Sequence, residues 1–127
     1  MITGFQVNLF TDGVDRLVEF YRALGFTERF RTPLDGPPDH IEVEAYGLTV
    51  GVTSLTSAHE VVPTLQAESG GRGVDLVLWC DDVDAQHAHA LRAGAVEAVA
   101  PLDSGGRLRM SWVNDPAGNR VKFVQPL

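Results

Sequence analysis

The sequence predicts an α+β fold built from two copies of one βαβββ unit. Residues 5–28 align without a gap on residues 74–97, so that Gly25 lies opposite Gly94. Each copy reads as a short apolar strand, an acidic helix cap, a helix and a glycine stop. A unit this short cannot bury its own apolar face, so the copies must pack together. The seam between two such units is a favourable place for a ligand.

The first copy begins with a strand over residues 5–10, followed by a helix over 14–24 that ends at Gly25. The apolar side of this helix recurs at helical spacing, at Val14, Leu17, Val18, Tyr21 and Leu24. Three strands are expected next, over residues 27–32, 40–46 and 48–54. A loop containing Gly36 and two prolines separates the first two of them.

The second copy repeats this order. It predicts a strand over residues 74–80, a helix over 83–93, and strands over 96–100, 108–114 and 119–125. The DPAG sequence at 115–118 predicts a tight turn between the last two strands. We therefore expect a single domain over 1–127, with repeats at 1–54 and 74–127 and a linker at 55–73.

Composition narrows the classes of function. The 127 residues are 44% hydrophobic and 21% charged, which is typical of a soluble globular protein. No apolar run approaches the about 20 residues of a membrane span, and no signal peptide is evident. The one cysteine, Cys80, excludes an internal disulfide and favours the cytoplasm. A net charge of −7 argues against nucleic acid and is compatible with a neutral or cationic ligand, or simply with solubility.

Three motifs in this βαβββ–βαβββ order carry a family resemblance: NLFTD at 8–12, FYRALGF at 20–26 and DPAGN at 115–119. The chain resembles the vicinal oxygen chelate superfamily, which holds glyoxalases, extradiol dioxygenases and bleomycin-resistance proteins. The run DPAGNRVKFV at 115–124 is most similar to the bleomycin-resistance branch. The resemblance implies the glyoxalase/bleomycin-resistance fold, in which curved mixed sheets enclose a cavity.

Alternation along the strands predicts which residues face that cavity. The reverse assignment would bury Gln6 and Asp75 beneath helices without partners, which is costly. The face of Trp112 stays undecided at this point. The expected ligand-binding residues are Gln6, Asn8, Phe10, Thr49, Gly51, Asp75, Val77, Trp79, Trp112 and Lys122.

Metal-dependent relatives bind one divalent ion with four cavity residues, and the resemblance places these at Gln6, Gly51, Asp75 and Lys122. Gly51 offers no donor, and a protonated lysine would repel a cation. We therefore expect no metal at these positions and no cofactor. The four histidines do not restore a site and are interpreted as surface or packing residues: His40, His59, His87 and His89.

Lys122 is the only lysine, and it is expected to face Asp75 across the cavity. An ammonium–carboxylate pair would then take the place of the ion. Such a pair could anchor a polar group of a ligand or serve as an acid/base pair. It could equally be a structural ion pair, or the lysine could extend to solvent.

Aromatic residues bear on the ligand. Phe10 and Trp79 occupy equivalent positions in the two copies and would suit a flat guest by stacking, although core packing is the simpler role for either. A glycine at position 51 would leave room for a bulky guest.

These observations favour a metal-free, cytoplasmic homodimer that binds a bulky, largely apolar or aromatic small molecule. The resemblance implies resistance to an antibiotic or toxic natural product by non-covalent sequestration. One alternative is a cofactor-free isomerase, cyclase or lyase that uses Asp75 and Lys122 as its catalytic pair. Another is a degenerate relative whose cavity is filled and which acts only in protein interaction.

Overall fold

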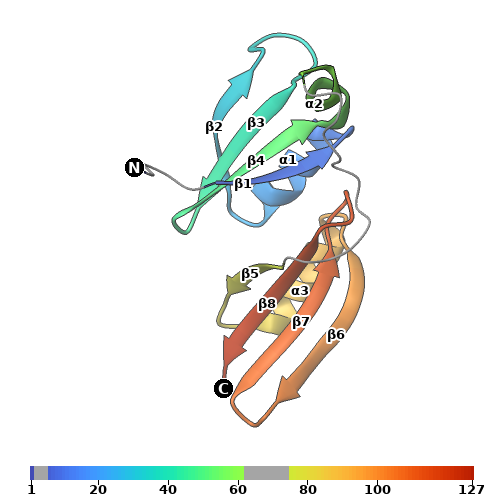
Figure 1. The fold of residues 1–127 in the computed structure, drawn as a ribbon. Coiled ribbons are helices and arrows are strands. Elements are labelled where there is room, and N and C mark those ends of the chain that lie inside the picture. Colours follow the sequence, from blue (N-terminus) through green and yellow to red (C-terminus); the bar gives the residue numbers. More distant parts are fainter. Residues whose placement is uncertain (2–5, 62–74) are drawn as a thin grey trace. The chain divides into compact units, whose positions relative to one another are not determined.

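The computed structural model describes residue 1 and residues 6–61 and 75–127. The chain divides into two compact units, residues 1–68 and 69–127, and each is described by itself. Each unit contains one four-stranded mixed sheet covered by a helix (Figure 1). The predicted α+β class and the repeated βαβββ order are confirmed.

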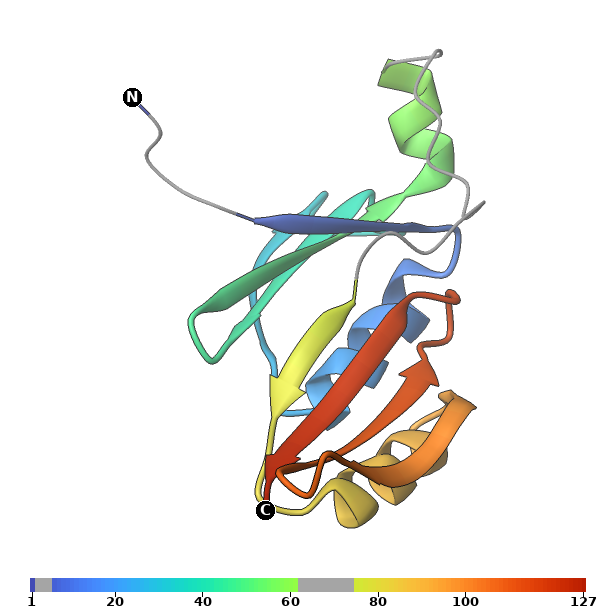
Figure 2. The same ribbon diagram turned by 60° about the horizontal axis from the view of Figure 1, so that its bottom comes forward.

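The first unit contains β1 (Val7–Thr11), α1 (Val14–Ala23), β2 (Thr27–Thr32), β3 (His40–Ala45), β4 (Leu48–Ser54) and α2 (Leu55–Val61). Its sheet has the order β1-β4-β3-β2, with β1 parallel to β4 and the other pairs antiparallel. The helix α1 packs on β3 and β4 (Figures 1 and 2).

The second unit repeats this topology with β5 (Leu76–Trp79), α3 (Val83–Arg92), β6 (Val96–Ser104), β7 (Leu108–Asn114) and β8 (Arg120–Pro126). The sheet order is β5-β8-β7-β6, and β5 is parallel to β8. Helix α3 packs on β6, β7 and β8. The equivalence of the two orders confirms the repeat that the sequence alignment predicted.

The core of each unit lies between its helix and its sheet. On the sheet side of the first unit the core consists of β-branched residues with no exposed surface: Ile41, Val43, Val50 and Val52. The stripe predicted on α1 faces them, and Leu17, Val18 and Tyr21 are nearly completely buried. In the second unit Val113, Val121 and Phe123 take the same place. The face of each sheet opposite α1 or α3 is called here the open face; in the first unit α2 contacts β4 at the end of that strand.

One helix was not expected. Residues 55–61, placed in the linker by the sequence, form α2. Its first turn is capped by Ser54, whose hydroxyl accepts a hydrogen bond from the backbone N–H of Ser57 at 3.2 Å. The prediction failed because the helix has only 7 residues and its capping serine belongs to the preceding strand. The remainder of the expected linker, 62–73, lies outside the described residues.

The second and sixth strands are irregular. In β2, Arg29 is an extra residue between Glu28 and Phe30, and its guanidinium pairs with Glu44 of β3. In β6 the pairing with β7 shifts twice, between Glu97 and Val99 and between Val99 and Leu102. The expected end of β6 at residue 100 was too early, because the strand continues through Pro101 to Ser104.

Two turns have clear physical causes. Tyr46 and Gly47 join β3 to β4 with φ values of 56° and 78°. The Tyr46 hydroxyl donates a hydrogen bond of 3.0 Å to the Leu24 carbonyl oxygen, which holds this residue in the left-handed region. The predicted turn at 115–118 is confirmed: Asp115 is buried, and one of its carboxylate oxygens accepts from the backbone N–H groups of Ala117 and Asn119.

Among the described residues, no helix is long and apolar enough to cross a membrane.

Candidate functional site

A hydrogen-bonded chain of polar side chains crosses the open face of the first unit. One oxygen of Glu42, Oε2, accepts from His40 Nε2 at 2.8 Å and from Gln6 Nε2 at 3.3 Å. The other ring nitrogen of His40, Nδ1, lies 2.8 Å from Thr53 Oγ1. Gln6 Nε2 also donates to Asn8 Oδ1 at 2.8 Å. The chain thus runs from β4 across β3 to the start of β1.

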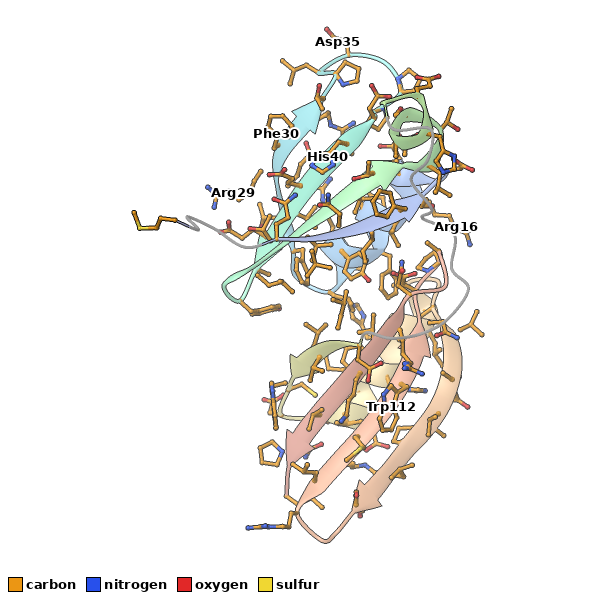
Figure 3. All side chains as sticks on the ribbon, viewed as in Figure 1. Arg16, Arg29, Phe30, Asp35, His40 and Trp112 are labelled. Atoms are coloured by element: carbon orange, nitrogen blue, oxygen red, sulfur yellow. The ribbon has the colours of Figure 1, made fainter. Side chains whose placement is uncertain are left out.

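Strand register brings these groups together. Asn8, Gly51 and Glu42 form one row across β1, β4 and β3, and Phe10, Thr53 and His40 form the next. Partners in a row share one face of the sheet. Figure 3 shows His40 on β3 and Phe30 on the adjacent β2, with ring centroids 6.2 Å apart.

Gly51 is required by this chain of polar groups. A Cβ atom at position 51 would overlap Asn8 Oδ1 and come within 2.8 Å of His40 Cε1 and 2.9 Å of Gln6 Nε2. The space above the glycine is therefore filled by the protein's own side chains. A glycine is needed at position 51 because a larger residue would clash with these side chains. The sequence had instead suggested that this glycine leaves room for a bulky guest.

The hydrogen bonds fix the neutral tautomer of His40. An ionised carboxylate only accepts, so the His40 nitrogen facing Glu42 must carry the hydrogen. The other nitrogen, Nδ1, then accepts from the Thr53 hydroxyl. His40 is half-buried, with 19% of its side chain exposed, and Glu42 is 29% exposed. A histidine held between a carboxylate and a hydroxyl on an accessible face is an arrangement suited to proton transfer.

The open face of the second unit is aromatic and cationic. Trp112 Nε1 donates to Asp75 Oδ2 at 3.3 Å, and the Arg120 guanidinium binds the other oxygen of Asp75. The ammonium nitrogen of Lys122 lies 5.1 Å from the centre of the Trp112 ring. Trp112 and Lys122 are cross-strand partners, which places Trp112 on the open face and settles the question that the sequence left open.

The expected ion pair between Asp75 and Lys122 is not formed. Asp75 precedes β5, and because Leu76 pairs with Val121, the neighbour of Asp75 on β8 is Arg120. Lys122 lies beside Val77 instead. The alternation of side chains along the strands correctly placed Asp75 and Lys122 on the same face. Which β8 residue lies beside Asp75, however, depends on the register between β5 and β8.

Apolar side chains surround the Trp112–Lys122 pair. Val77 is 45% exposed, Trp79 65% and Val99 40%. Met110 and Val124 are paired across β7 and β8 on the same face. Among the other predicted residues, Phe10 and Thr49 are half-buried in the first unit. Phe10 and Trp79 thus belong to separate units, each with its own open face.

The residues at the family's metal-binding positions do not fit a divalent ion. Gly51 has no donor and is covered by neighbouring side chains, while Lys122 is a cation. The Asp75 carboxylate is already bound by Arg120 and Trp112. Within residues 6–61 and 75–127, no three His, Cys, Asp or Glu side chains are grouped so that they could hold a metal ion.

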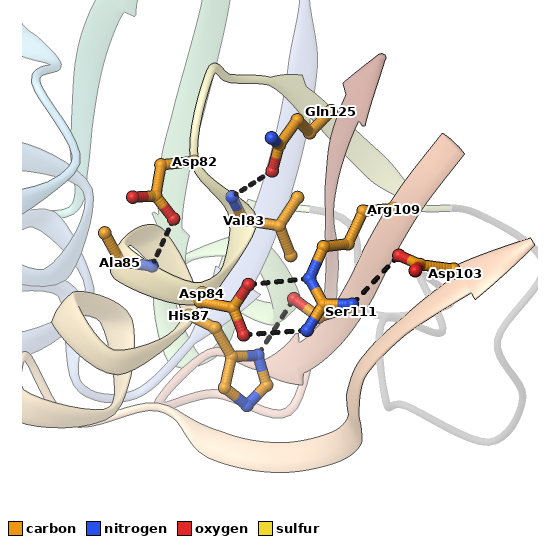
Figure 4. Close-up of polar contacts among 9 residues, drawn as sticks. All are labelled: Asp82, Val83, Asp84, Ala85, His87, Asp103, Arg109, Ser111 and Gln125. Atoms are coloured by element: carbon orange, nitrogen blue, oxygen red, sulfur yellow. Dashed lines mark hydrogen bonds and ion pairs between the residues drawn. The ribbon is translucent and has the colours of Figure 1, made fainter. Parts of the chain in front are cut away.

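His87 has a packing role, as the sequence predicted, and Cys80 is a half-buried free thiol. His87 of α3 is buried, with Nδ1 2.9 Å from Ser111 Oγ and Nε2 2.7 Å from Glu97 Oε2. Figure 4 shows the contact with Ser111 beneath the helix, next to the ion pairs of Arg109. Burial raises the pKa of the Cys80 thiol, which disfavours the reactive thiolate.

Sequence reasoning missed His40 and Glu42 as site residues. The available signal was the alternation of β3, in which His40, Glu42 and Glu44 are polar and Ile41 and Val43 are apolar. Polar residues at every second position of a strand mark its uncovered face. Applying to this strand the rule used for the first would have placed His40 and Glu42 on the open face, although not their partners.

Known proteins resemble this chain over nearly its whole length. An uncharacterized protein of Mycobacterium bovis is 31% identical over 126 residues, covering 94% of this chain and 81% of the relative. A solved family enzyme from Burkholderia phytofirmans shares the fold with a TM-score of 0.81 at 24% identity, over 96% of this chain and 97% of that one. TioX from Micromonospora has a TM-score of 0.73 at 26% identity, over 98% and 100%.

The family model described as glyoxalase/bleomycin resistance protein/dioxygenase superfamily matches residues 5–123. This match extends from the first unit into β8 of the second and includes His40, Glu42, Trp112 and Lys122. The chain belongs to the glyoxalase/bleomycin resistance protein/dioxygenase superfamily.

Proposed function

We propose that this protein binds a flat, largely apolar small molecule with an acidic group, on the open face of the second unit, without a metal and without converting it. The observation that carries the proposal is the placement of Lys122 against Trp112 among exposed apolar side chains. An indole ring offers a flat stacking surface, and an ammonium beside it offers a charge for an acid.

The local charge balance favours an acidic ligand over a cationic one. Asp75 is neutralised by Arg120, and within the described residues no carboxylate pairs with Lys122. The positive charge of Lys122 is therefore available to a ligand. The overall net charge of −7 suggested a neutral or cationic guest, but the charge at the site is a better guide because screening weakens distant charges.

The wider role that we propose is sequestration of a toxic natural product such as an antibiotic, in the cytoplasm and as a homodimer. Family membership supports this role, since the matching model includes bleomycin resistance proteins. Cys80 as the only cysteine supports a reducing compartment. Light scattering at micromolar concentration tests the dimer, and a monomer mass would contradict it.

The enzyme alternative based on Asp75 and Lys122 has less support. Both oxygens of the Asp75 carboxylate are already engaged, one by the Arg120 guanidinium and the other by the indole N–H of Trp112. The two side chains also lie next to different partners, so they do not form an acid/base pair.

Two matched probes test the proposal: 2-naphthoate and its uncharged analogue 2-naphthamide, with affinity measured by calorimetry. We expect the acid to bind more tightly than the amide. Lys122→Met should lower the affinity for the acid about tenfold, a loss of about 1.4 kcal/mol in binding free energy. The same variant should leave the affinity for the amide unchanged. Trp112→Ala should weaken binding of both probes by ~1–3 kcal/mol.

Arg107→Met is the control, because it removes an exposed cation of the same unit from the β6–β7 turn. Equal affinity for the acid and the amide in the wild-type protein would contradict the proposed ligand class. For the native ligand, sequestration predicts recovery of the unchanged compound after long incubation. Recovery of a converted product would instead establish an enzyme.

A further inference from the structure

Residues 6–61 and 75–127 contain two hydroxyl–histidine–carboxylate chains with the same connectivity. In the first unit Thr53 contacts His40 Nδ1, and His40 Nε2 contacts Glu42. In the second, Ser111 contacts His87 Nδ1, and His87 Nε2 contacts Glu97. A hydroxyl beside a histidine that is oriented by a carboxylate is a recurring arrangement for activating an O–H group.

The histidine is accessible to a ligand in only one of these two chains. In the second unit Ser111 has no exposed surface and His87 is 4% exposed beneath α3, so that only the Glu97 end of the chain reaches solvent. In the first unit the His40 and Glu42 side chains are 19% and 29% exposed on the face opposite α1. The buried chain is explained by packing, because each of its polar groups needs a partner. His40 and Glu42 are partly exposed to water, so the need of buried polar groups for hydrogen-bond partners does not explain their arrangement.

The His40 chain can accept a proton without losing a hydrogen bond. In the neutral state Nε2–H donates to Glu42 and Nδ1 accepts from the Thr53 hydroxyl. When His40 gains a proton at Nδ1, the Thr53 oxygen becomes the acceptor, since a hydroxyl can both donate and accept. The Glu42 carboxylate oxygen, 2.8 Å from His40 Nε2, lies beside the ring that would carry the new charge.

Neighbouring groups hold the Glu42 carboxylate in its contact with His40. Gln6 donates to the same Glu42 oxygen and fixes its position. Glu44, two residues along β3, is paired with Arg29, so its charge is compensated locally. The ring of Phe30, tilted at 56° to His40, provides an apolar wall beside the imidazole.

We propose that Thr53, His40 and Glu42 form a proton relay that ionises a weakly acidic hydroxyl, such as a phenol or an enol, of a ligand bound on the open face of the first unit. The ligand O–H bond breaks and its proton passes to Thr53 Oγ1, while the Thr53 proton passes to His40 Nδ1. The ligand is left as an anion, and the imidazolium is balanced by Glu42. The relay uses residues of the first unit alone.

The probe that tests the relay is 4-nitrophenol, because its phenolate form absorbs visible light and reports ionisation directly. We expect the bound probe to ionise about one pH unit below the free probe, which corresponds to tenfold stabilisation of the anion. Thr53→Val and His40→Gln should abolish this shift. Thr53→Ser keeps the hydroxyl and should retain most of it.

Thr27→Val is the matched control, since Thr27 lies on β2 of the same sheet and pairs with Glu44 rather than with a histidine. It should leave the shift unchanged. The relay is overturned if the probe does not bind, if the bound probe titrates like the free one, or if Thr53→Val and His40→Gln behave like the wild type. A shift lost in Lys122→Met alone would likewise overturn it and assign the effect to the second unit. Failure of the naphthoate experiment leaves this result unaffected.

Discussion

The indole Nε1 of Trp112 donates a hydrogen bond of 3.3 Å to Oδ2 of Asp75, which lies just before β5. This bond connects β7 to the beginning of the second unit's first strand and fixes the ring against which Lys122 rests.

Trp112→Phe should therefore keep an aromatic ring but remove the hydrogen-bond donor. The expected loss in unfolding free energy is ~0.5–1.5 kcal/mol, the usual net value of one hydrogen bond. Urea unfolding monitored by circular dichroism measures it. Asp75→Asn retains an acceptor for the indole while losing the charge that Arg120 binds. If Trp112→Phe leaves the free energy of unfolding unchanged, the bond contributes nothing to stability.

Gly51→Ala should destabilise the first unit, because the added Cβ overlaps Asn8 Oδ1. A cost of ~1–3 kcal/mol is typical of an overfilled site. The double variant Gly51→Ala/Asn8→Ala removes the closest clash and should recover part of the loss. Full stability of the single variant in thermal unfolding would show that the polar chain above Gly51 rearranges freely.

Elemental analysis of extensively dialysed protein should find no stoichiometric zinc, iron, manganese or nickel bound through Gln6, Gly51, Asp75 and Lys122. The missing donor at Gly51 and the charge of Lys122 are the reasons. One transition metal per chain that is lost on Asp75→Ala would contradict this expectation.

Acid should weaken the contact between α3 and β7. The hydrogen bonds from Arg109 hold the pKa of Asp84 below its usual value. A carboxyl whose pKa is lower in the folded state stabilises the fold fully above its unfolded-state pKa. That contribution is lost as the pH falls through the lower, folded-state pKa. The melting temperature of Asp84→Asn should accordingly change less between pH 5 and pH 2 than that of the wild type. Identical pH profiles would refute the contribution of this pair.

Local patterns were sufficient to predict the repeated units, α1, α3 and the turn after β7. Apolar spacing marked the buried side of α1, and the Asp115 turn could be read from its DPAG sequence. These features depend on residues that are near one another in the chain. The same alternation placed Gln6 and Asn8 on the open face with Gly51.

Pairings between distant residues could not be predicted in the same way. The choice of Arg120 over Lys122 as the partner of Asp75 depends on the register of two strands 45 residues apart. His40 and Thr53 become neighbours only through the β3–β4 register. A histidine beside a proline-rich loop carries no local sign of this contact, because its partners are brought to it by the sheet.

The irregular pairing of β2 and β6 has a consequence for association between molecules. Both are edge strands, the last in the orders β1-β4-β3-β2 and β5-β8-β7-β6. An interrupted edge is a poor template for an added strand, and proteins use such bulges to prevent sheets from joining. The extra Arg29 places a charged residue at one of these interruptions. At the other edges, β1 and β5 pair with their single neighbours in unbroken register. Another molecule that extends either sheet would therefore find a regular backbone at β1 or β5, and an obstructed one at β2 or β6.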